Sequence, residues 1–189
     1  MIDCSEKTDE EIVVYVIENH EIFACLVDRY EAKLRRYLRR LMPGIQEEID
    51  DVLQEIFIKA YVNVHGFDER LKFSSWIYRI AHNEAVSWLR KKKSRPKLTE
   101  LGEDDFKTFN ESIDISMILH ERKLTKDEVS RTLRLLRPRY RSVLILKYLE
   151  GRSYEEMSDI LSVPSGTVAI LIHRAKKEFN NLYQKQYEK

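Results

Sequence analysis

Residues 153–179 read SYEEMSDILSVPSGTVAILIHRAKKEF, and this stretch carries the pattern that most directly indicates the fold. Ser153 followed three residues later by Glu156 is the signature of a capping box, which predicts that a helix begins here. The apolar face of this helix is expected to consist of Tyr154, Met157, Ile160 and Leu161. A short turn, SVP, leads to a second, basic helix whose inward positions are expected to be Val168, Ile172, Ala175 and Phe179. Two short helices, a tight turn and a basic second helix are the requirements of a helix-turn-helix.

The rest of the chain also favours helices over strands. Only five glycines and four prolines occur among 189 residues, and long helices need few such breaks. Apolar residues at three- and four-residue spacing predict further helices over residues 9–19, 22–41, 49–64, 73–89, 129–136 and 143–149. The periodicity is lost in the acidic stretch KLTELGEDDFKTFN, residues 97–110. We therefore predict an all-α protein in which two small helical domains, residues 1–95 and 129–189, are joined by a flexible acidic linker, residues 96–128.

Charge is distributed unevenly along the chain, although the formal net charge is only +1. Residues 66–95 and 129–189 carry net charges of +5 and +6, whereas residues 1–28 and 96–128 carry −7 and −4. A single basic run could simply be a solvated helix end that is stabilised by the helix dipole. Two basic blocks separated by an acidic stretch indicate instead that a polyanion such as DNA binds at two places.

Composition excludes several classes of protein. A hydrophobic fraction of 43% with balanced charge is too high for a disordered chain. The longest apolar runs, Ile12–Ile17 and Val168–Ile172, are far shorter than the ~18 residues of a membrane span. The N-terminus is acidic where a signal peptide would be basic, so we expect a cytoplasmic protein. Cys4 and Cys25 are 21 positions apart, which predicts neither a disulfide framework nor a zinc site and fits a soluble protein of a reducing compartment.

The sequence shows no catalytic constellation. It has no glycine-rich phosphate loop, no H-E-x-x-H motif and no Cys/His spacing for a metal. The carboxylates Glu47, Glu48, Asp50 and Asp51 fall at a predicted helix start, where they suit the helix dipole, so we do not assign them to a metal. We therefore expect a protein that is not an enzyme and that uses no cofactor, metal or small-molecule substrate.

Several motifs resemble those of the extracytoplasmic-function (ECF) sigma factors of the sigma-70 family. Residues 133–179, with LRPRYR, LKYLEGRSYEE and GTV followed by HRA, resemble the family's C-terminal promoter-binding domain. DDVLQEIFIKAY, residues 50–61, resembles its polymerase-binding helix, and FDERLKFSSWIYRIAHNEAVSWLRKKK, residues 67–93, resembles its promoter-melting segment. The matches cover roughly residues 20–95 and 129–180 in the family's order. They imply a transcription initiation factor that binds core RNA polymerase and gives it promoter specificity.

The resemblance implies a polymerase-binding surface on the predicted helix over residues 49–64. Asp51, Gln54 and Glu55 match the family's D-x-x-Q-E motif, and Ile58 lies one turn further on. In the family this surface meets the clamp coiled coil of the polymerase, where charged groups can pair with basic partner residues and set the orientation. Taken without the resemblance, these residues could equally form an ordinary solvated helix face.

The resemblance assigns residues 67–95 to opening and holding the −10 strand. Single-stranded DNA binding requires aromatic side chains that stack on bases and basic side chains that contact phosphates, and this segment contains both. The turn over residues 67–75 matches the loop that captures a flipped base. The expected −10 contacts are Phe67, Arg70, Lys72, Ser75, Arg79, Asn83 and Arg90. We expect Trp76 and Trp88 to pack in the core and His82 to be exposed polar surface.

The second helix of the predicted helix-turn-helix should read the −35 duplex. The expected contacts are Ser165, Thr167, Ile170, Leu171, Arg174 and Lys177. The family typically has Lys, Ser and Arg after GTV, whereas this chain has Ala169, Ile170 and Leu171. Apolar side chains can contact thymine methyl groups but cannot donate to guanine. One hypothesis is therefore an A/T-biased −35 element, and the other is that Ile170 and Leu171 form an exposed patch covered by a protein partner.

The expected partners are core RNA polymerase, promoter DNA in duplex and single-stranded form, and an anti-sigma factor, which in this family is often membrane-bound. We expect the acidic segments to weaken DNA binding by the free chain until the polymerase separates the domains. Two alternative functions remain, a stand-alone helix-turn-helix regulator of duplex DNA and a helical protein-interaction module. The aromatic and basic residues of segment 67–95 argue against the first, and the two basic blocks argue against the second.

Overall fold

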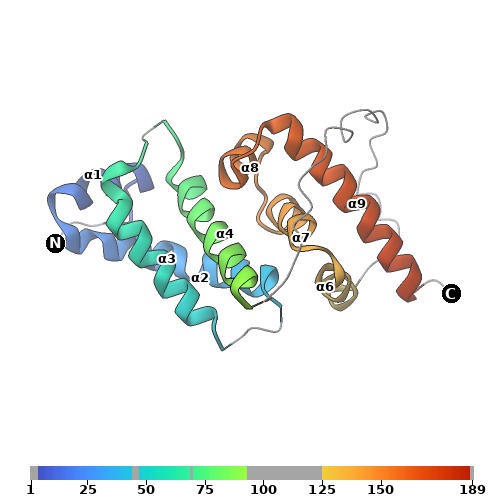
Figure 1. Cartoon of the computed structure of the whole chain (residues 1–189). Helices are drawn as coiled ribbons and strands as arrows, with labels where there is room; N and C mark the ends of the chain where they lie inside the picture. Colours follow the sequence, from blue (N-terminus) through green and yellow to red (C-terminus); the bar gives the residue numbers. More distant parts are fainter. Residues whose placement is uncertain (1–3, 44–46, 69, 93–124, 188–189) are drawn as a thin grey trace.

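The computed structural model describes residues 4–43, 47–68, 70–92 and 125–187, which form helices and turns without any strand (Figure 1). The predicted all-α class is therefore confirmed. No helix within these ranges is long and apolar enough to cross a membrane. Residues 96–124 of the predicted linker lie outside the described residues.

The N-terminal half contains the helices α1 (Asp9–Glu18), α2 (Phe23–Leu41), α3 (Ile49–Asn63) and α4 (Phe73–Lys92). Single turns of 3-10 helix, η1 (His20–Ile22) and η2 (Val64–Gly66), follow α1 and α3. Thr8 and Glu11 form a capping box that begins α1. Buried residues recur along α2 at three- and four-residue spacing, as its sequence predicts: Phe23, Leu26, Tyr30, Leu34, Tyr37, Leu38 and Leu41.

The C-terminal half contains α6 (Lys126–Leu135), α7 (Pro138–Leu144), a π-helical turn η4 (Ile145–Leu149), α8 (Tyr154–Leu161) and α9 (Ser165–Tyr187). The predicted capping box at α8 is confirmed, because Ser153 and Glu156 each accept a bond from the backbone N–H of the other, at 3.1 and 2.9 Å. Ser162 then adopts a left-handed conformation, with φ 54°, and ends α8. The Ser158 hydroxyl donates to the Val163 carbonyl across the turn at 2.6 Å. The helix-turn-helix predicted from residues 153–179 is therefore present.

The two halves pack against each other through α4 and α8, which lie side by side in the middle of the molecule (Figure 1). α2, α3 and α4 pack together on one side of this contact, and α7 packs on α9 on the other. The buried apolar side chains of both halves form one continuous cluster. Trp76 is buried and Trp88 is partly buried against this cluster, so the prediction that both tryptophans pack in the core is confirmed.

The cysteines differ from the prediction, because Cys4 and Cys25 form a disulfide. The chain before α1 lies along α2, where the Arg29 guanidinium donates to the carbonyls of Cys4 and Lys7 and pairs with the Asp9 carboxylate at 2.7 Å. Cys25 and Arg29 are four residues apart on α2 and therefore share a face. This fold-back brings the two sulfurs together, and cysteine spacing alone could not reveal it.

His82 also differs from the prediction of an exposed polar residue. Its ring is partly buried, and Nδ1 lies 3.1 Å from the hydroxyl of Tyr37, whose side chain is fully buried. Burial lowers the pKa of His82 to about 4, so the imidazole is neutral at pH 7.

Candidate polymerase and DNA interfaces

The predicted polymerase-binding residues form an exposed stripe along α3. Asp51, Gln54, Glu55 and Ile58 are all exposed, at the three- and four-residue spacing that places them on one face. Ile58 leaves 49% of its surface exposed, and Val62, one turn further on, leaves 66%. Buried Val52, Leu53 and Ile56 hold the opposite face of α3 against the core. The structure thus presents a polar stripe with apolar residues at its C-terminal end.

The turn before α4 presents some of the predicted −10 residues and buries others. Arg70 is exposed and forms a bidentate pair with Asp68, which lowers the pKa of that carboxyl to about 2. Lys72 is also exposed, and its ammonium group lies 3.2 Å from the Glu156 carboxylate of α8. The side chain of Ser75 is buried in the core.

Phe67 is likewise buried rather than exposed for stacking. Its ring packs edge-on against Phe73 and Trp76, with centroid distances of 5.8 and 5.6 Å. The expectation that Phe67 and Ser75 face DNA is therefore wrong for this arrangement. Packing three aromatic rings removes more apolar surface from water than leaving one of them in the turn.

Further along α4, the remaining −10 candidates share a solvent-facing side. Asn83 and Arg90 are exposed and Arg79 is partly exposed. Ile77, Ala81 and Ala85 hold the opposite side of the helix in the core. A polar amide between two guanidinium groups along one helix face can contact both bases and phosphates.

The predicted −35 residues lie mostly on one side of α9. Ser165 and Lys177 are exposed, and Thr167, Ile170 and Arg174 are partly exposed. Thr167, Ile170, Arg174 and Lys177 recur at intervals of three and four residues, so they follow one side of the helix, whereas Ser165 lies at its N-terminal end, two residues before Thr167. The structure therefore brings four of the six predicted −35 residues to one side of α9.

Leu171 is buried instead, with only 1% of its surface exposed. It lies three residues after the buried Val168 and four before the buried Ala175, so it shares their inward face. The expectation that Leu171 faces outward is therefore wrong. This removes half of the apolar patch proposed from the sequence, and Ile170 is the apolar side chain that remains at the surface.

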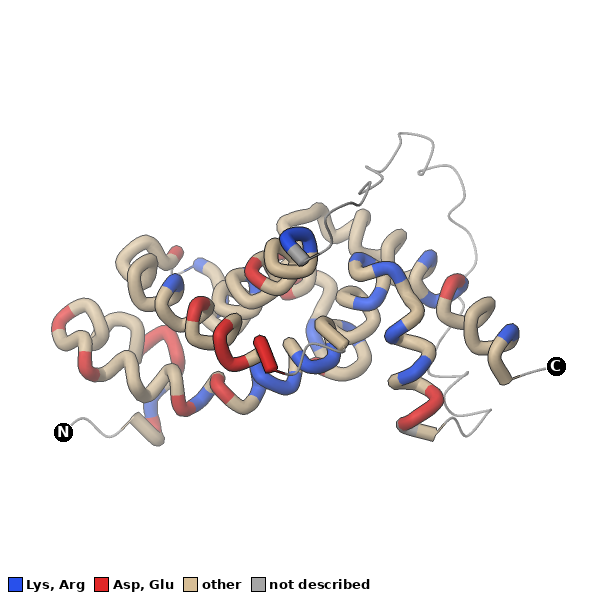
Figure 2. Tube along the Cα trace, turned by 60° about the horizontal axis from the view of Figure 1, so that its bottom comes forward, with Lys and Arg blue, Asp and Glu red and all other residues tan. Residues whose placement is uncertain are grey.

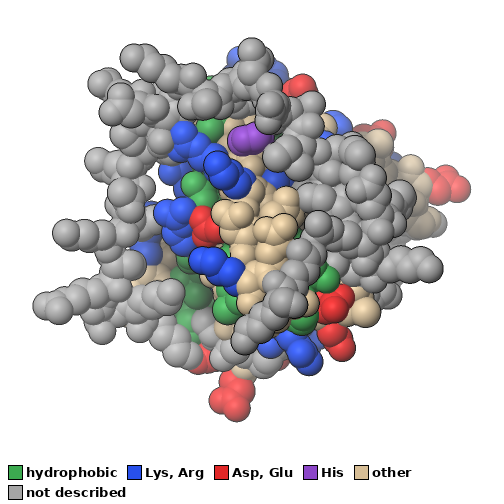
Figure 3. Space-filling view, turned by 90° about the vertical axis from the view of Figure 1, so that its right-hand side faces the viewer, with side chains coloured by type: hydrophobic (Ala, Val, Ile, Leu, Met, Phe, Trp, Pro, Cys, Tyr) green, Lys and Arg blue, Asp and Glu red, His purple; other side chains and the backbone are tan. Residues whose placement is uncertain are grey.

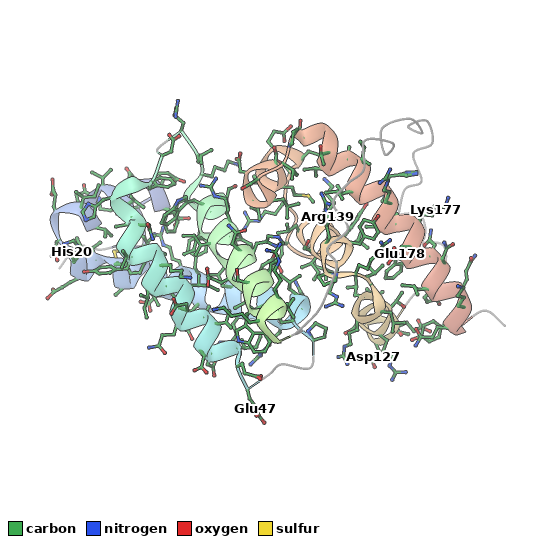
Figure 4. All side chains as sticks on the ribbon, in the orientation of Figure 1. His20, Glu47, Asp127, Arg139, Lys177 and Glu178 are labelled. Atoms are coloured by element: carbon green, nitrogen blue, oxygen red, sulfur yellow. A yellow bond between two sulfur atoms is a disulfide. The ribbon has the colours of Figure 1, made fainter. Side chains whose placement is uncertain are left out.

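The charge pattern is visible in three dimensions. Asp and Glu are frequent around the N-terminal helices, whereas Lys and Arg predominate towards the middle and the C-terminal half (Figure 2). Basic side chains gather in a row on the face at the C-terminal end of the molecule (Figure 3). Arg139 and Lys177 lie in this half, whereas His20 lies at the opposite end (Figure 4).

Arg141 has a role that sequence reasoning missed, because the arginine-rich stretch LRPRYR suggested a DNA-binding surface. Its guanidinium group is buried and donates to the carbonyls of Leu133, Arg134, Leu136 and Leu41 at 2.7–3.0 Å. Desolvation lowers its pKa to about 10, which leaves the group charged at pH 7. The side chain thus closes the C-terminal end of α6 and reaches the end of α2. Neighbouring Arg137 and Arg139 remain at least partly exposed.

Comparison with known proteins agrees with this arrangement. Residues 26–95 match the family model for sigma-70 region 2, and residues 126–179 match the model for sigma-70 region 4. The exposed stripes of α3 and α4 lie within the first match. The helix-turn-helix lies within the second.

Relatives match over most of the chain. The ECF RNA polymerase sigma factor SigW of Bacillus subtilis is 36% identical over 164 residues, which span 84% of this chain and 87% of that protein. The ECF RNA polymerase sigma-E factor of Escherichia coli K12 is 31% identical over 187 residues, which span 95% of this chain and 97% of that protein. The sigma factor RpoE of Bartonella quintana, solved in complex with the anti-sigma factor NepR, has a similar fold, with a TM-score of 0.61 at 19% identity over 88% of this chain and 98% of that one. This chain therefore belongs to the ECF group of sigma-70 family RNA polymerase sigma factors.

Proposed function

We propose that this chain binds core RNA polymerase and directs it to specific promoters, with the C-terminal half on the −35 duplex and the N-terminal half on the opened −10 strand. Promoter-directed transcription initiation is the function of the family to which the chain belongs. The observation that supports this assignment of roles is that α3, α4 and α9 each present a different exposed face. One face is acidic and apolar, and the other two are polar and basic.

The α3 stripe is the surface that we assign to the polymerase. Asp51 and Glu55 can pair with basic residues of a partner, and Gln54 can form hydrogen bonds beside them. Ile58 supplies an apolar anchor within this polar surround, an arrangement typical of protein interfaces. A DNA-binding role for this face is unfavourable, because its two carboxylates would repel phosphates.

The α4 face is the surface that we assign to the −10 strand. Arg70, Lys72, Arg79 and Arg90 would contact phosphates, and Asn83 would read a base edge. Phe67 and Ser75 would instead support the turn from the core side, because they are buried. The aromatic cluster around Phe67 then acts as a rigid base for the basic residues above it.

The α9 face is the surface that we assign to the −35 duplex. Ser165 and Thr167 lie in the first turn of the helix, while Arg174 and Lys177 lie further along it and would neutralise phosphates. Ile170 can contact a thymine methyl group but cannot read guanine. We therefore keep the hypothesis of an A/T-biased −35 element and base it on Ile170 alone. Strong discrimination in favour of G·C at the contacted positions, measured on a panel of −35 variants, would exclude it.

The −10 assignment can be tested by fluorescence anisotropy with DNA that is premelted at the −10 element. We expect the chain with core polymerase to bind this DNA more tightly than the same DNA fully paired. Arg79→Ala and Asn83→Ala should each weaken binding by about tenfold, the loss of about 1.4 kcal/mol. Lys185→Ala removes an exposed cation near the end of α9 and serves as the control. Equal binding to premelted and paired DNA would contradict the assignment.

The stand-alone regulator is less favoured, because the chain matches sigma-70 region 2 as well as region 4. We also propose an anti-sigma partner, because RpoE of Bartonella quintana, which shares this fold, was solved with the anti-sigma factor NepR bound. A cytoplasmic location follows from the proposed partners, since bacterial core polymerase and promoter DNA are found there. Purification of the tagged chain from its native cells, followed by identification of the proteins that accompany it, tests for both protein partners, core polymerase and an anti-sigma factor. Recovery without polymerase would contradict the proposal.

A further inference from the structure

A buried carboxylate joins the two halves of the molecule. Glu150, which precedes the helix-turn-helix, leaves only 4% of its side chain exposed. Its Oε1 lies 2.7 Å from Nη1 of Arg40 at the end of α2, and its Oε2 accepts a hydrogen bond of 2.8 Å from the Tyr78 hydroxyl of α4. A buried charge of this kind is tolerated only when it is paired and hydrogen-bonded. Both partners of Glu150 come from the other half of the chain, so this pairing requires the two halves to stay together.

Further polar contacts surround this carboxylate. The Arg152 guanidinium lies 4.2 Å above the Tyr78 ring and donates to the Ser74 hydroxyl at 3.3 Å. Lys72 and Glu156 form the ion pair described above. Burial, together with the Glu150 charge, raises the pKa of Tyr78 to about 12, so its hydroxyl remains a donor at pH 7. Each of these contacts joins α4, or the turn before it, to α8 or the residues just before α8.

The closed chain is too small to occupy both promoter elements at once, because a compact chain of 189 residues has a radius of gyration of about 16 Å. The −10 and −35 elements are centred about 25 base pairs apart, which corresponds to about 85 Å at about 3.4 Å per base pair. Here the −10 candidate Lys72 instead lies against the first helix of the helix-turn-helix. The two halves must therefore separate before each can reach its own element.

We propose that Glu150 is the centre of a latch that holds the free chain closed, and that Arg40 and Tyr78 must release it before both promoter elements can be bound. This inference rests on the proposed function, because that function assigns DNA contacts to both halves. A closed majority state lowers the apparent affinity for DNA by the fraction of open molecules. Core polymerase, by binding the open chain, would shift the population towards it.

The test compares Glu150→Gln with Glu155→Gln in the full-length chain without polymerase. Both changes remove one negative charge from neighbouring positions, but Glu155 is exposed on α8. They therefore alter nonspecific attraction to DNA equally, and only Glu150→Gln weakens the latch. Tyr78→Phe is a milder second variant that removes one hydrogen bond with little change in volume. Circular dichroism first establishes that each variant is folded.

Small-angle X-ray scattering and anisotropy with DNA premelted at −10 are the two measurements. We expect Glu150→Gln to increase the radius of gyration and to raise affinity for this DNA by about fivefold or more relative to Glu155→Gln, within the usual range of coupling between sites. Tyr78→Phe should change both quantities in the same direction. An unchanged radius of gyration, or equal affinities for the two Gln variants, would overturn the latch. If Glu150→Gln does not fold, the response of Tyr78→Phe decides the question.

A failure of the latch can be distinguished from a failure of the proposed function. The scattering measurement needs neither DNA nor polymerase, so it reports closure whatever the chain does. Transcription with core polymerase and the unmodified chain reports the function whether or not the latch exists.

Discussion

At the scale of single residues, His82 makes a prediction about pH. Its pKa is about 4 in the folded chain, against an ordinary value of 6.5, because the ring is desolvated beside Tyr37. The unfolded chain therefore binds a proton between pH 6.5 and 4 that the folded chain does not. We expect the free energy of unfolding to fall by about 1–3 kcal/mol as pH is lowered through this window. Urea unfolding at a series of pH values measures it, with His82→Gln as reference. Parallel pH dependence in both proteins would contradict the assignment.

The neighbouring residues Ile170 and Leu171 make a second prediction at this scale. Leu171→Ala removes a buried side chain and should lower the free energy of unfolding by about 2–5 kcal/mol. Ile170→Ala should cost much less stability, because Ile170 is partly exposed, but it should weaken binding to an A/T-containing −35 duplex. Urea unfolding and anisotropy on both variants separate the two roles. If the Leu171→Ala protein is as stable as the parent chain but binds the −35 duplex more weakly, the result would contradict the buried position and support the outward position that the sequence suggested.

At the scale of elements, the α3 stripe makes a third prediction. Ile58→Asp places a charge in the proposed polymerase interface and should weaken binding to core polymerase by at least about tenfold. Val14→Asp on α1 is the matched control, because Val14 is 47% exposed and Ile58 is 49% exposed. Both variants should keep the stability of the parent chain, since neither side chain is in the core. An equal loss of core affinity in the two variants would remove α3 from the interface.

The elements also show how much the sequence could predict. α1–α4, α8 and α9 lie where apolar spacing and caps place them, because each buries one face and these signals are local in the chain. The exposed stripe of α3 follows from the same periodicity. What the sequence could not show depends on packing between distant segments. Cys4 meets Cys25 through a fold-back of the N-terminus, and Phe67 is buried by Phe73 and Trp76.

Other features that were not predicted from the sequence have the same cause or a simpler one. Nothing near Glu150 in sequence indicates that Arg40 and Tyr78 will enclose it, since both lie in the other half of the chain. The inward position of Leu171 was within reach of the periodicity, because this residue lies three positions after the inward Val168. The family's polar residues at the matching positions favoured an outward side chain instead, and the local periodicity proved the better guide.

At the scale of the whole molecule, the near-neutral net charge combines two basic blocks with acidic segments that offset them. The structure changes how the expected weakening of DNA binding by the acidic N-terminus can be tested. Deleting residues 1–20 would also remove the buried Ile12, Val13 and Val16 of α1 and expose the core beneath them. Changing the exposed Glu18 and Glu21 to Gln leaves this packing intact. The free chain should then bind DNA more tightly in anisotropy at low salt, and unchanged affinity would reject a restraint by these acidic groups.

The central claim also concerns the whole molecule: the chain is a promoter-specificity factor for RNA polymerase. The most direct measurement is run-off transcription in vitro with purified core polymerase, the full-length chain and a library of promoter fragments. We predict that neither protein alone initiates at defined sites, and that together they produce transcripts from a subset of fragments that share −35 and −10 elements. Tight, sequence-specific duplex binding by the chain alone, without any transcript when core polymerase is added, would contradict the account.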